Sequence, residues 1–385
     1  MDKPIKIVIN ELGGAQWTGG ITYRNNLLKA IKTKGPTDQI VCLSSNPENS
    51  GLDPSFKIIK IQTRFNAIEK ILSRVLKSFF DFDYSLYKTT KSEKPDVLFP
   101  HSLCIGNNAS LIFWIPDFQF VHLPHLYPSG YVEMNRKKLD GYFKKAKIIV
   151  VSSEDALKDL KLFLPQHVSK TRVMRFVAHV PERLYLDDPK EAIDTYNLPS
   201  DFIFLPNQFW SHKNHLAVFE ALKLLQEENI FPYIVCTGNP VDVRNPGYLA
   251  GMLQKISELG VRNQVAFLGL LPHDHVYSLI RQSKCVLNPS LFEGWSTSVE
   301  EAKSVGKRMV LSDLDVHKEQ APAKSLYFER SSTEDLARQL KKAWLEFESG
   351  PDLELEKEAR SILNDRMKGF ANRFFDICEE ANKIK

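Results

Sequence analysis

Two acidic residues stand in the segment of the sequence that carries the most chemistry. Residues 288–302 read NPSLFEGWSTSVEEA, so Glu293 and Glu301 are separated by seven residues. If a helix begins between them, its N–H groups can bind a phosphate while the two carboxylates accept hydrogen bonds from polyol hydroxyls. The alternative is that Glu301 lies on a solvated helix face and that Glu293 only favours the helix dipole.

The residues around this pair predict a strand, a loop and a helix. An apolar strand ends at Pro289, and Thr297-x-x-Glu300 has the form of a capping box that starts a helix. That helix is expected to end near Gly306. The first carboxylate then lies in the loop, and the second lies in the second helical turn.

A lysine follows a predicted strand in the second half of the chain. Residues 202–215 read FIFLPNQFWSHKNH, which places Lys213 after the strand. Ligands of doubly wound α/β sheets bind beyond the carboxyl ends of strands. Lys213 is therefore placed for a diphosphate, as a compact charge with three donors. The alternative is a solvated surface lysine.

Glycines follow the first predicted strand. Residues 11–20 read ELGGAQWTGG and precede a helical stretch that starts at Ile21. Glycines at such a turn let the backbone approach a phosphate or a sugar. The spacing is not G-x-G-x-x-G, so a dinucleotide fingerprint is not met, and a plain tight turn explains the glycines equally well.

Short apolar runs alternate with helical stretches along nearly the whole chain, which predicts two doubly wound parallel α/β sheets. The first series of strands is expected at 6–10, 39–43, 57–61, 97–100, 111–115 and 147–152, and the second at 202–206, 233–238, 265–269, 285–289, 308–312 and 325–328. Two prolines in an aperiodic stretch place the linker at about 178–195. The expected domains are 1–180 and 195–365, and residues 366–385 form a tail helix with one apolar face.

Composition bounds the class of protein. A chain of 385 residues with 43% apolar and 25% charged residues is long enough for two packed cores and argues against extended disorder. No run of apolar residues is long enough to span a bilayer, and the N-terminus lacks a secretory signal, so we expect a cytoplasmic protein. The five cysteines are widely spaced without a C-x-x-C pair and are interpreted as reduced core residues.

Charge is divided unevenly along the chain. Residues 1–190 contain 28 Lys plus Arg and 19 Asp plus Glu, a balance of +9, whereas residues 191–385 contain 23 and 28, a balance of −5. The first half is therefore expected to face something anionic, either phosphates or a membrane surface. No nucleic-acid module or basic stripe with stacking aromatics is present, so nucleic acid is not expected as a partner.

One basic amphipathic stretch has two interpretations. Residues 64–80 place Arg64, Lys70, Arg74 and Lys77 beside apolar residues at helical spacing. Such a helix can lie on an anionic membrane. We favour the other interpretation, a helix packed on a sheet, because the apolar stripe is broad.

The motif around Glu293 and Glu301 resembles the E-x7-E segment of the family 4 glycosyltransferases. Lys213 within His-Lys-Asn-His is similar to the phosphate-binding segment of that family. Residues 265–269 and 306–313 correspond to its Phe-Leu-Gly and Gly-x-Pro strands. The resemblance is strong over 200–345 and fainter over 1–180. It implies the GT-B fold, in which two Rossmann-like domains face across a cleft and a C-terminal helix crosses back to the first domain.

The resemblance also implies roles for individual residues. Glu301 would bind the ribose of a nucleoside diphosphate sugar, and Glu293 would contact hydroxyls of the transferred sugar. Lys213 would bind the diphosphate together with the backbone N–H groups of the segment that follows Glu293, which contains Gly294, Trp295 and Ser296. Gly19 and Gly20 would close over the diphosphate from the first domain.

In this scheme positive charge and helix dipoles stabilise the leaving diphosphate, so neither a divalent metal nor a cofactor is expected. The sequence contains no cluster of His, Cys and Asp residues with metal-ligand spacing that would contradict this expectation. The nucleotide sugar is the co-substrate.

The sequence departs from the family pattern at functional positions. Gln208 replaces the arginine that usually stands five residues before the lysine, so it adds a hydrogen-bond donor but no charge. The usual His-Asp after the fifth strand is replaced by WIPDFQFVHLP over 114–124, similar to a subgroup of bacterial surface-polysaccharide transferases. Asp117 or His122 would then orient the acceptor hydroxyl or the donor sugar. The alternatives are a turn cap for Asp117 and a loop histidine for His122.

We therefore expect a retaining hexosyltransferase that acts on a growing glycan or lipid-linked oligosaccharide, with GDP-mannose slightly favoured as donor. Retention is implied by the family. One rival is a nucleotide-sugar 2-epimerase of the same fold, and another is a non-catalytic nucleotide-sugar binding protein.

Overall fold

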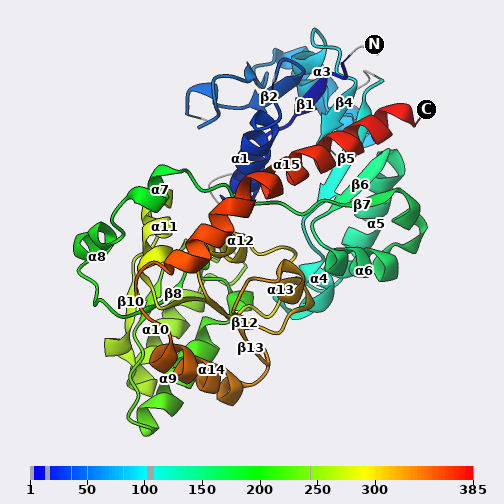
Figure 1. Cartoon of the computed structure of the whole chain (residues 1–385). Coiled ribbons are helices and arrows are strands. Elements are labelled where there is room, and N and C mark those ends of the chain that lie inside the picture. Colours follow the sequence, from blue (N-terminus) through cyan, green and yellow to red (C-terminus); the bar gives the residue numbers. More distant parts are fainter. Residues whose placement is uncertain are drawn as a thin grey trace. The chain divides into compact units, whose positions relative to one another are not determined.

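The computed structural model describes residues 4–13, 18–35, 37–49, 51–80, 82–101, 108–242 and 244–384. The chain forms two compact units (Figure 1). Unit 1 contains residues 1–118, 129–176 and 365–385, and unit 2 contains residues 119–128 and 177–364. A short segment from the first half of the sequence, residues 119–128, therefore packs within unit 2.

Unit 1 is built on a seven-stranded parallel sheet with the order β3-β2-β1-β4-β5-β6-β7. Its central strands are short, rich in branched apolar residues and buried, as expected for a parallel sheet covered on both faces. The strands are β1 (Ile7–Ile9), β2 (Ile40–Ser44), β3 (Lys57–Lys60), β4 (Val97–Phe99), β5 (Ser110–Ile115), β6 (Ile148–Val151) and β7 (Thr171–Val173).

The helices of unit 1 are α1 (Thr18–Lys32), α2 (Ala67–Phe80), α3 (Tyr84–Thr90), α5 (Tyr131–Lys145), α6 (Glu154–Phe163) and the second part of α15 (Leu353–Lys383). The apolar face of α15 packs on this unit. Phe374 meets the ring of Phe99 from β4 edge to face, with ring centroids 5.3 Å apart. Arg172 and Glu380 form an ion pair that joins β7 to the same helix.

Unit 2 contains a six-stranded parallel sheet with the order β10-β9-β8-β11-β12-β13. Its strands are β8 (Ile203–Leu205), β9 (Ile234–Cys236), β10 (Val265–Phe267), β11 (Cys285–Asn288), β12 (Met309–Ser312) and β13 (Leu326–Phe328). The chain leaves β8 toward β9 and β10 and returns on its other side as β11. The boundary between β8 and β11 is therefore the topological switch point, where ligands of such sheets bind.

Unit 2 also contains helices. They are α4 (Gln119–His122), α7 (Arg183–Leu186), α8 (Lys190–Tyr196), α9 (His215–Glu227), α10 (Tyr248–Leu259), α11 (His273–Gln282), α12 (Thr297–Val305), α13 (Asp315–Gln320), α14 (Thr333–Glu346) and the first part of α15. Buried side chains of α9 and α14 form one core with the strands, including Phe219, Leu222 and Leu340.

The predicted sheets are confirmed, because all twelve expected strands are present with ends displaced by no more than two residues. β7 was not predicted, since its three residues are Thr, Arg and Val and carry no apolar run. The stretch expected to be an aperiodic linker contains the short helices α7 and α8.

The preferred interpretation of residues 64–80 as a helix packed on a sheet is wrong. The helix forms as α2, but it contains no buried residue. Ile68 and Phe79 are 78% and 79% exposed. Helical periodicity located the helix, but it could not show whether another part of the protein covers its apolar face.

Four of the five cysteines, Cys42, Cys236, Cys285 and Cys378, are buried free thiols. Burial raises the pKa of Cys42 and of Cys285 to about 12. Cys104 lies outside the described residues. Among the helices that the structure describes, none has the length and apolar character needed to cross a membrane.

Candidate active site

The site lies at the switch point of unit 2, where two asparagines end neighbouring strands. Asn207 follows β8, Asn288 is the last residue of β11, and the Asn207 Nδ2 donates to Asn288 Oδ1 over 3.2 Å. Asn288 Nδ2 donates to Ser296 Oγ over 2.8 Å. These bonds hold the loop over residues 289–296 against the ends of both strands.

Lys213 and Glu293 meet in this loop region. The ammonium of Lys213 donates to Glu293 Oε1 over 2.6 Å, and the side chains are only 13% and 9% exposed. Ser290 Oγ donates to the same carboxylate oxygen over 2.7 Å. Burial is the largest single influence and opposes ionisation of the Glu293 carboxyl, but the charge and hydrogen bond of Lys213, together with His317 and Ser290, outweigh it and leave the pKa of Glu293 below its usual range. The predicted phosphate-binding lysine and sugar-binding carboxylate are therefore ion-paired with each other.

A glycine permits this close packing of loops. Gly238 follows β9 with a φ of +142°, and a Cβ there would lie 2.5 Å from the backbone oxygen of Asn207. Only a glycine fits at this distance without movement of the loop that follows β8.

The predicted capping box is wrong. Helix α12 begins at Thr297, but its N-cap is Ser296, whose side chain makes no capping hydrogen bond. Gln320 from α13 performs part of that function, because its Oε1 accepts from the Ser296 N–H over 3.2 Å and its Nε2 donates to Glu300 Oε1 over 3.2 Å. A glutamine 24 residues away in the sequence has thus replaced the local cap.

This contact also bears on the expected phosphate-binding amides. Gly294, Trp295 and Ser296 precede α12 as predicted, but the Ser296 N–H is already bonded to Gln320. A phosphate bound by the Ser296 N–H would have to displace Gln320.

Glu301 lies in the second turn of α12 and is buried. Its Oε1 is 2.7 Å from Nε2 of His273, the first residue of α11, whose side chain is half exposed. His273 was not identified from the sequence, although it follows the strand that resembles the Phe-Leu-Gly strand of the family. A buried carboxylate beside a half-exposed imidazole can accept hydrogen bonds from a diol at the protein surface.

Buried histidines surround the ion pair. His317 Nδ1 lies 2.9 Å from the backbone oxygen of Ser312, and because a carbonyl only accepts, this nitrogen carries the proton. Burial lowers the pKa of His317, and its Nε2 has no hydrogen-bond partner among the described residues. Burial and the nearby charges of Lys213 and Arg244 hold the pKa of His212 well below its usual range. Neutral imidazoles therefore flank a charged pair.

The other predicted site residues are divided between the two units. Gly19 and Gly20 lie in the first turn of α1, which begins at Thr18 rather than at Ile21, and the residues 14–17 of the glycine-containing loop lie outside the described residues. Asp117 follows β5 in unit 1 and is half-buried.

Two predicted residues lie in unit 2 near the ion pair. His122 ends α4 and stacks on Phe292, with ring centroids 4.9 Å apart, so it contacts the residue before Glu293. The Oε1 atom of Gln208 accepts from the backbone N–H of Asn239 over 2.8 Å. This bond orients the Gln208 side chain.

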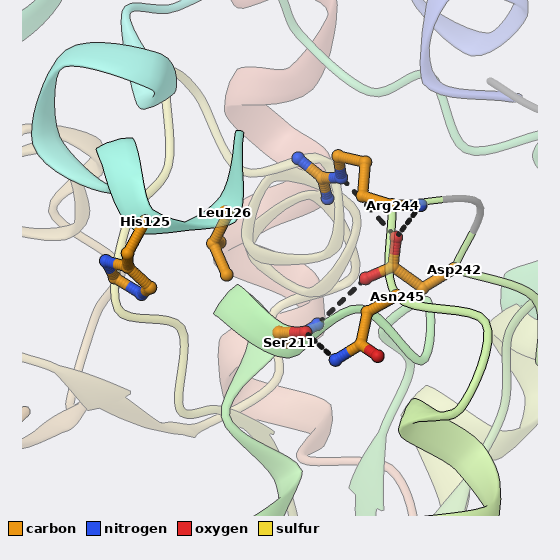
Figure 2. Close-up of a pocket in the computed structure, with 6 residues that line it drawn as sticks. All are labelled: His125, Leu126, Ser211, Asp242, Arg244 and Asn245. Carbon is orange, nitrogen blue, oxygen red and sulfur yellow. Dashed lines mark hydrogen bonds and ion pairs between the residues drawn. The ribbon is translucent and has the colours of Figure 1, made fainter. Parts of the chain in front are cut away.

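An arginine that the sequence analysis did not identify lies close to this region. Arg244, from the loop after β9, donates to Gln119 Oε1 over 2.5 Å and to the Tyr127 hydroxyl over 3.1 Å, and its guanidinium lies over the ring of Trp210. Its side chain lines a pocket that the loops after β8 and β9 form with the segment 119–128 (Figure 2). The volume of this pocket is about 200 Å³. The lining residues are His125, Leu126, Ser211, Asp242, Arg244 and Asn245.

Arg244 and Asp242 organise this pocket. Asp242 Oδ2 accepts from the backbone N–H of Ser211 over 3.2 Å, and Asp242 Oδ1 accepts from the N–H of Arg244 over 3.0 Å. No sequence motif marks these residues, because their partners come from three separate segments. In the part of the chain that the structure describes, no group of three or more His, Cys, Asp or Glu side chains is arranged to hold a metal ion.

Similar proteins fall into one class of enzyme. Residues 190–360 match the family described as Glycosyl transferases group 1. A UDP-Gal:alpha-D-GlcNAc-diphosphoundecaprenol alpha-1,3-galactosyltransferase of Escherichia coli is 24% identical over 300 residues, which cover 72% of this chain and 71% of that protein. The serotype-specific mannosyltransferase WbdA of Escherichia coli is 26% identical over 207 residues, which cover 52% of this chain and 25% of WbdA.

Solved structures share the fold over the whole chain. Sucrose-phosphate synthase from Thermosynechococcus elongatus has a TM-score of 0.68 at 15% identity, and the alignment covers 98% of this chain and 97% of that one. Anabaena HepE, solved in complex with UDP and glucose, has a TM-score of 0.67 at 15% identity, with 97% and 99% covered. The fold is therefore GT-B, and the family match together with the curated relatives makes the protein a glycosyltransferase.

Proposed function

We propose that this glycosyltransferase moves a hexosyl unit from a nucleoside diphosphate sugar to a hydroxyl of a growing glycan or lipid-linked oligosaccharide. The observation that carries the proposal is the ion pair of Lys213 and Glu293 at the switch point of unit 2, with Glu301 buried on the helix that follows the same loop, inside the region that matches the glycosyltransferase family. A cation, a helix N-terminus and two carboxylates are the groups needed to bind a diphosphate between a ribose and a hexose.

Each of the three residues has a separate role in this proposal. Glu301 accepts hydrogen bonds from the ribose hydroxyls, and His273 orients its carboxylate through the 2.7 Å contact. Glu293 accepts from hydroxyls of the transferred hexose. Lys213 binds the diphosphate together with the backbone N–H groups of Gly294 and Trp295.

The ion pair suggests how the donor is received. Lys213 and Glu293 neutralise each other, so neither charge is left unpaired in a nearly buried position. When the diphosphate arrives, its charge competes for the ammonium, and the carboxylate becomes available to sugar hydroxyls. The negative charge that grows on the leaving diphosphate then strengthens its bond to Lys213, which is the differential binding that accelerates a reaction.

The finer features follow the family 4 resemblance. We propose retention of configuration by a front-face reaction, in which the leaving diphosphate helps to deprotonate the acceptor hydroxyl. Lys213 and the helix N-terminus provide the positive charge for this step, and the proposal includes no metal and no cofactor. Transfer should therefore survive a chelator, and loss of activity in EDTA with rescue by a divalent ion would contradict the mechanism.

Two nucleotide sugars are candidate donors. GDP-mannose is the first candidate, supported by the similarity to the mannosyltransferase WbdA. UDP-galactose is the second, because the galactosyltransferase relative covers a larger share of this chain.

Thermal unfolding in a panel of UDP and GDP sugars tests the proposal and separates the two donors. A bound ligand at about 100 times its dissociation constant stabilises the folded protein by about 2.7 kcal/mol. The donor that stabilises the protein should also be hydrolysed slowly when no acceptor is present. No shift with any nucleotide sugar, or with free UDP and GDP, would refute a nucleotide-sugar site.

A further inference from the structure

Helix α2 of unit 1 presents an apolar face to solvent. With 3.6 residues per turn, Ile68, Ile71, Leu72, Val75 and Phe79 share one side of the helix. All five side chains are exposed, and the exposed fraction of Ile71, in the middle of the group, is 62%. Isolated apolar residues at a surface are ordinary, but a contiguous group of this kind marks an interaction surface.

The charges on the same helix identify the kind of partner. Arg64 precedes the helix, and Lys70, Arg74 and Lys77 lie on it. These four side chains are exposed, and none of them forms an ion pair with another described residue. Glu69 is the only acidic residue of α2, and its carboxylate is bonded to Lys88 of α3 over 2.5 Å. The acid is therefore turned toward the protein, and the exposed surface of α2 is apolar and cationic.

We infer that α2 lies on an anionic lipid bilayer, with its apolar face in the interfacial region and its cations among the headgroups. A helix of 14 residues is about 21 Å long, which is too short to span a bilayer but is suitable for lying along its surface. The excess of positive charge in residues 1–190, +9 from 28 Lys plus Arg and 19 Asp plus Glu, favours the same partner.

A second copy of the chain fits this surface less well. Pairing two α2 faces would bring two sets of unpaired cations together, and each set would repel the other. An anionic membrane instead provides an apolar acyl-chain region for the apolar face and negatively charged headgroups for the cations. The inference uses only unit 1 and does not depend on the donor or on the transfer reaction.

Sedimentation with lipid vesicles tests the inference. We expect the full-length protein to bind vesicles of phosphatidylcholine mixed with phosphatidylglycerol much more strongly than vesicles of phosphatidylcholine alone, and to be released by high salt. Each lysine or arginine near an anionic surface contributes about fivefold in partitioning. The triple variant Lys70→Gln, Arg74→Gln and Lys77→Gln should therefore bind about a hundredfold more weakly.

A second triple variant tests the apolar face, and a control matches it on another helix. Ile68→Gln, Val75→Gln and Phe79→Gln should abolish vesicle binding without lowering the melting temperature, because these side chains are exposed. Leu162 on α6 is 83% exposed, and Lys161 beside it is also exposed. The control variant Lys161→Gln with Leu162→Gln should bind like the wild type.

Three results would overturn the inference. The first is equal binding of the wild type to the two kinds of vesicle. The second is an equal loss of binding in the α6 control variant. The third is a dimer of the wild type in sedimentation velocity that the apolar variant converts to a monomer, which would show that a second copy covers the face. All these measurements are made without a nucleotide sugar, so failure of the proposed transfer reaction would not affect them.

Discussion

The ion pair between Lys213 and Glu293 permits a prediction in which stability and ligand binding change in opposite directions. Its atoms are 2.6 Å apart and its side chains are 13% and 9% exposed. Coulomb's law with an effective dielectric constant of about 20 gives roughly 6 kcal/mol at this distance, part of which offsets the desolvation of both groups. Removing one partner of a buried pair costs about 3 to 5 kcal/mol. Glu293→Gln keeps the side-chain shape and an acceptor oxygen, so we expect a loss of about 3 kcal/mol in the free energy of unfolding.

Binding of a nucleoside diphosphate should not weaken in this variant. In the proposed site the diphosphate competes with Glu293 for the ammonium of Lys213. Glu293→Gln removes the competing charge, so UDP or GDP should bind equally well or up to about tenfold more tightly. Sugar transfer should fall by about 10- to 100-fold, because a charge-assisted hydrogen bond to the hexose, worth about 1.5 to 3 kcal/mol, is lost.

Urea unfolding and titration calorimetry of the nucleotide complete the test, with a surface pair as control. Glu227 lies 3.9 Å from Lys223 on α9 and is exposed. Glu227→Gln should therefore cost no more than about 0.5 kcal/mol. Equal small costs in the two variants would show that the buried pair contributes nothing to stability. A tenfold or larger loss of nucleotide affinity in Glu293→Gln would show that the carboxylate supports the diphosphate rather than competing with it.

Four further outcomes are expected. Glu301→Ala should weaken nucleoside diphosphate binding by tenfold or more in calorimetry, since charge-assisted bonds to the ribose are lost, and unchanged affinity would contradict the ribose assignment. Lys213→Ala should lower turnover by about a hundredfold, because in the proposed mechanism the lysine acts on charge that develops in the transition state, and an effect on KM alone would make it a simple anchor. Asp117→Asn should lower transfer by about a hundredfold with nucleotide binding unchanged, whereas full activity with a loss of about 1 kcal/mol in stability would make Asp117 a turn cap. Burial lowers the pKa of His215 to about 3, so the unfolded state takes up a proton near pH 6.5 that the folded state does not, and this group alone should lower stability by about 2 kcal/mol between pH 7 and pH 5. In urea titrations of His215→Asn the acid-dependent loss should be smaller by about this amount, because His212 and His317, whose pKa values are also lowered, still contribute.

The strands were predictable because their signal is local. A run such as Ile148–Val151 is buried on both faces of a parallel sheet, so every residue in it is apolar. Alternation of such runs with helical stretches then determines the fold class. The approximate positions of Lys213 and Glu293 followed from the same pattern, since each comes just after a strand of one parallel sheet. β7 has no such run and was missed for that reason.

Contacts between distant segments were not predictable in the same way. The spacing Thr297-x-x-Glu300 matches a capping box, but Gln320 makes the hydrogen bonds that the local motif was expected to make. The ion pair joins residues 80 positions apart, and the pattern could assign a role to each residue only separately. The exposure of α2 was not predicted for a similar reason. The amphipathic period of a helix is the same whether a protein or a membrane covers the apolar face of that helix.

The sequence assigned Asp117 and His122 to the same role, whereas the structure places them in different units. Five residues apart, both were candidates to replace one missing histidine. The boundary between the two compact units falls between them, after Phe118. His122 stacks on Phe292 beside the loop that holds Glu293, so a role for its imidazole would concern the donor sugar. Asp117 stays with the sheet of unit 1 at the end of β5, so a role for its carboxylate would concern groups bound by that unit. Because the two roles belong to different units, loss of transfer in a His122 variant should be accompanied by a change in preference among donor sugars, and loss in an Asp117 variant should not.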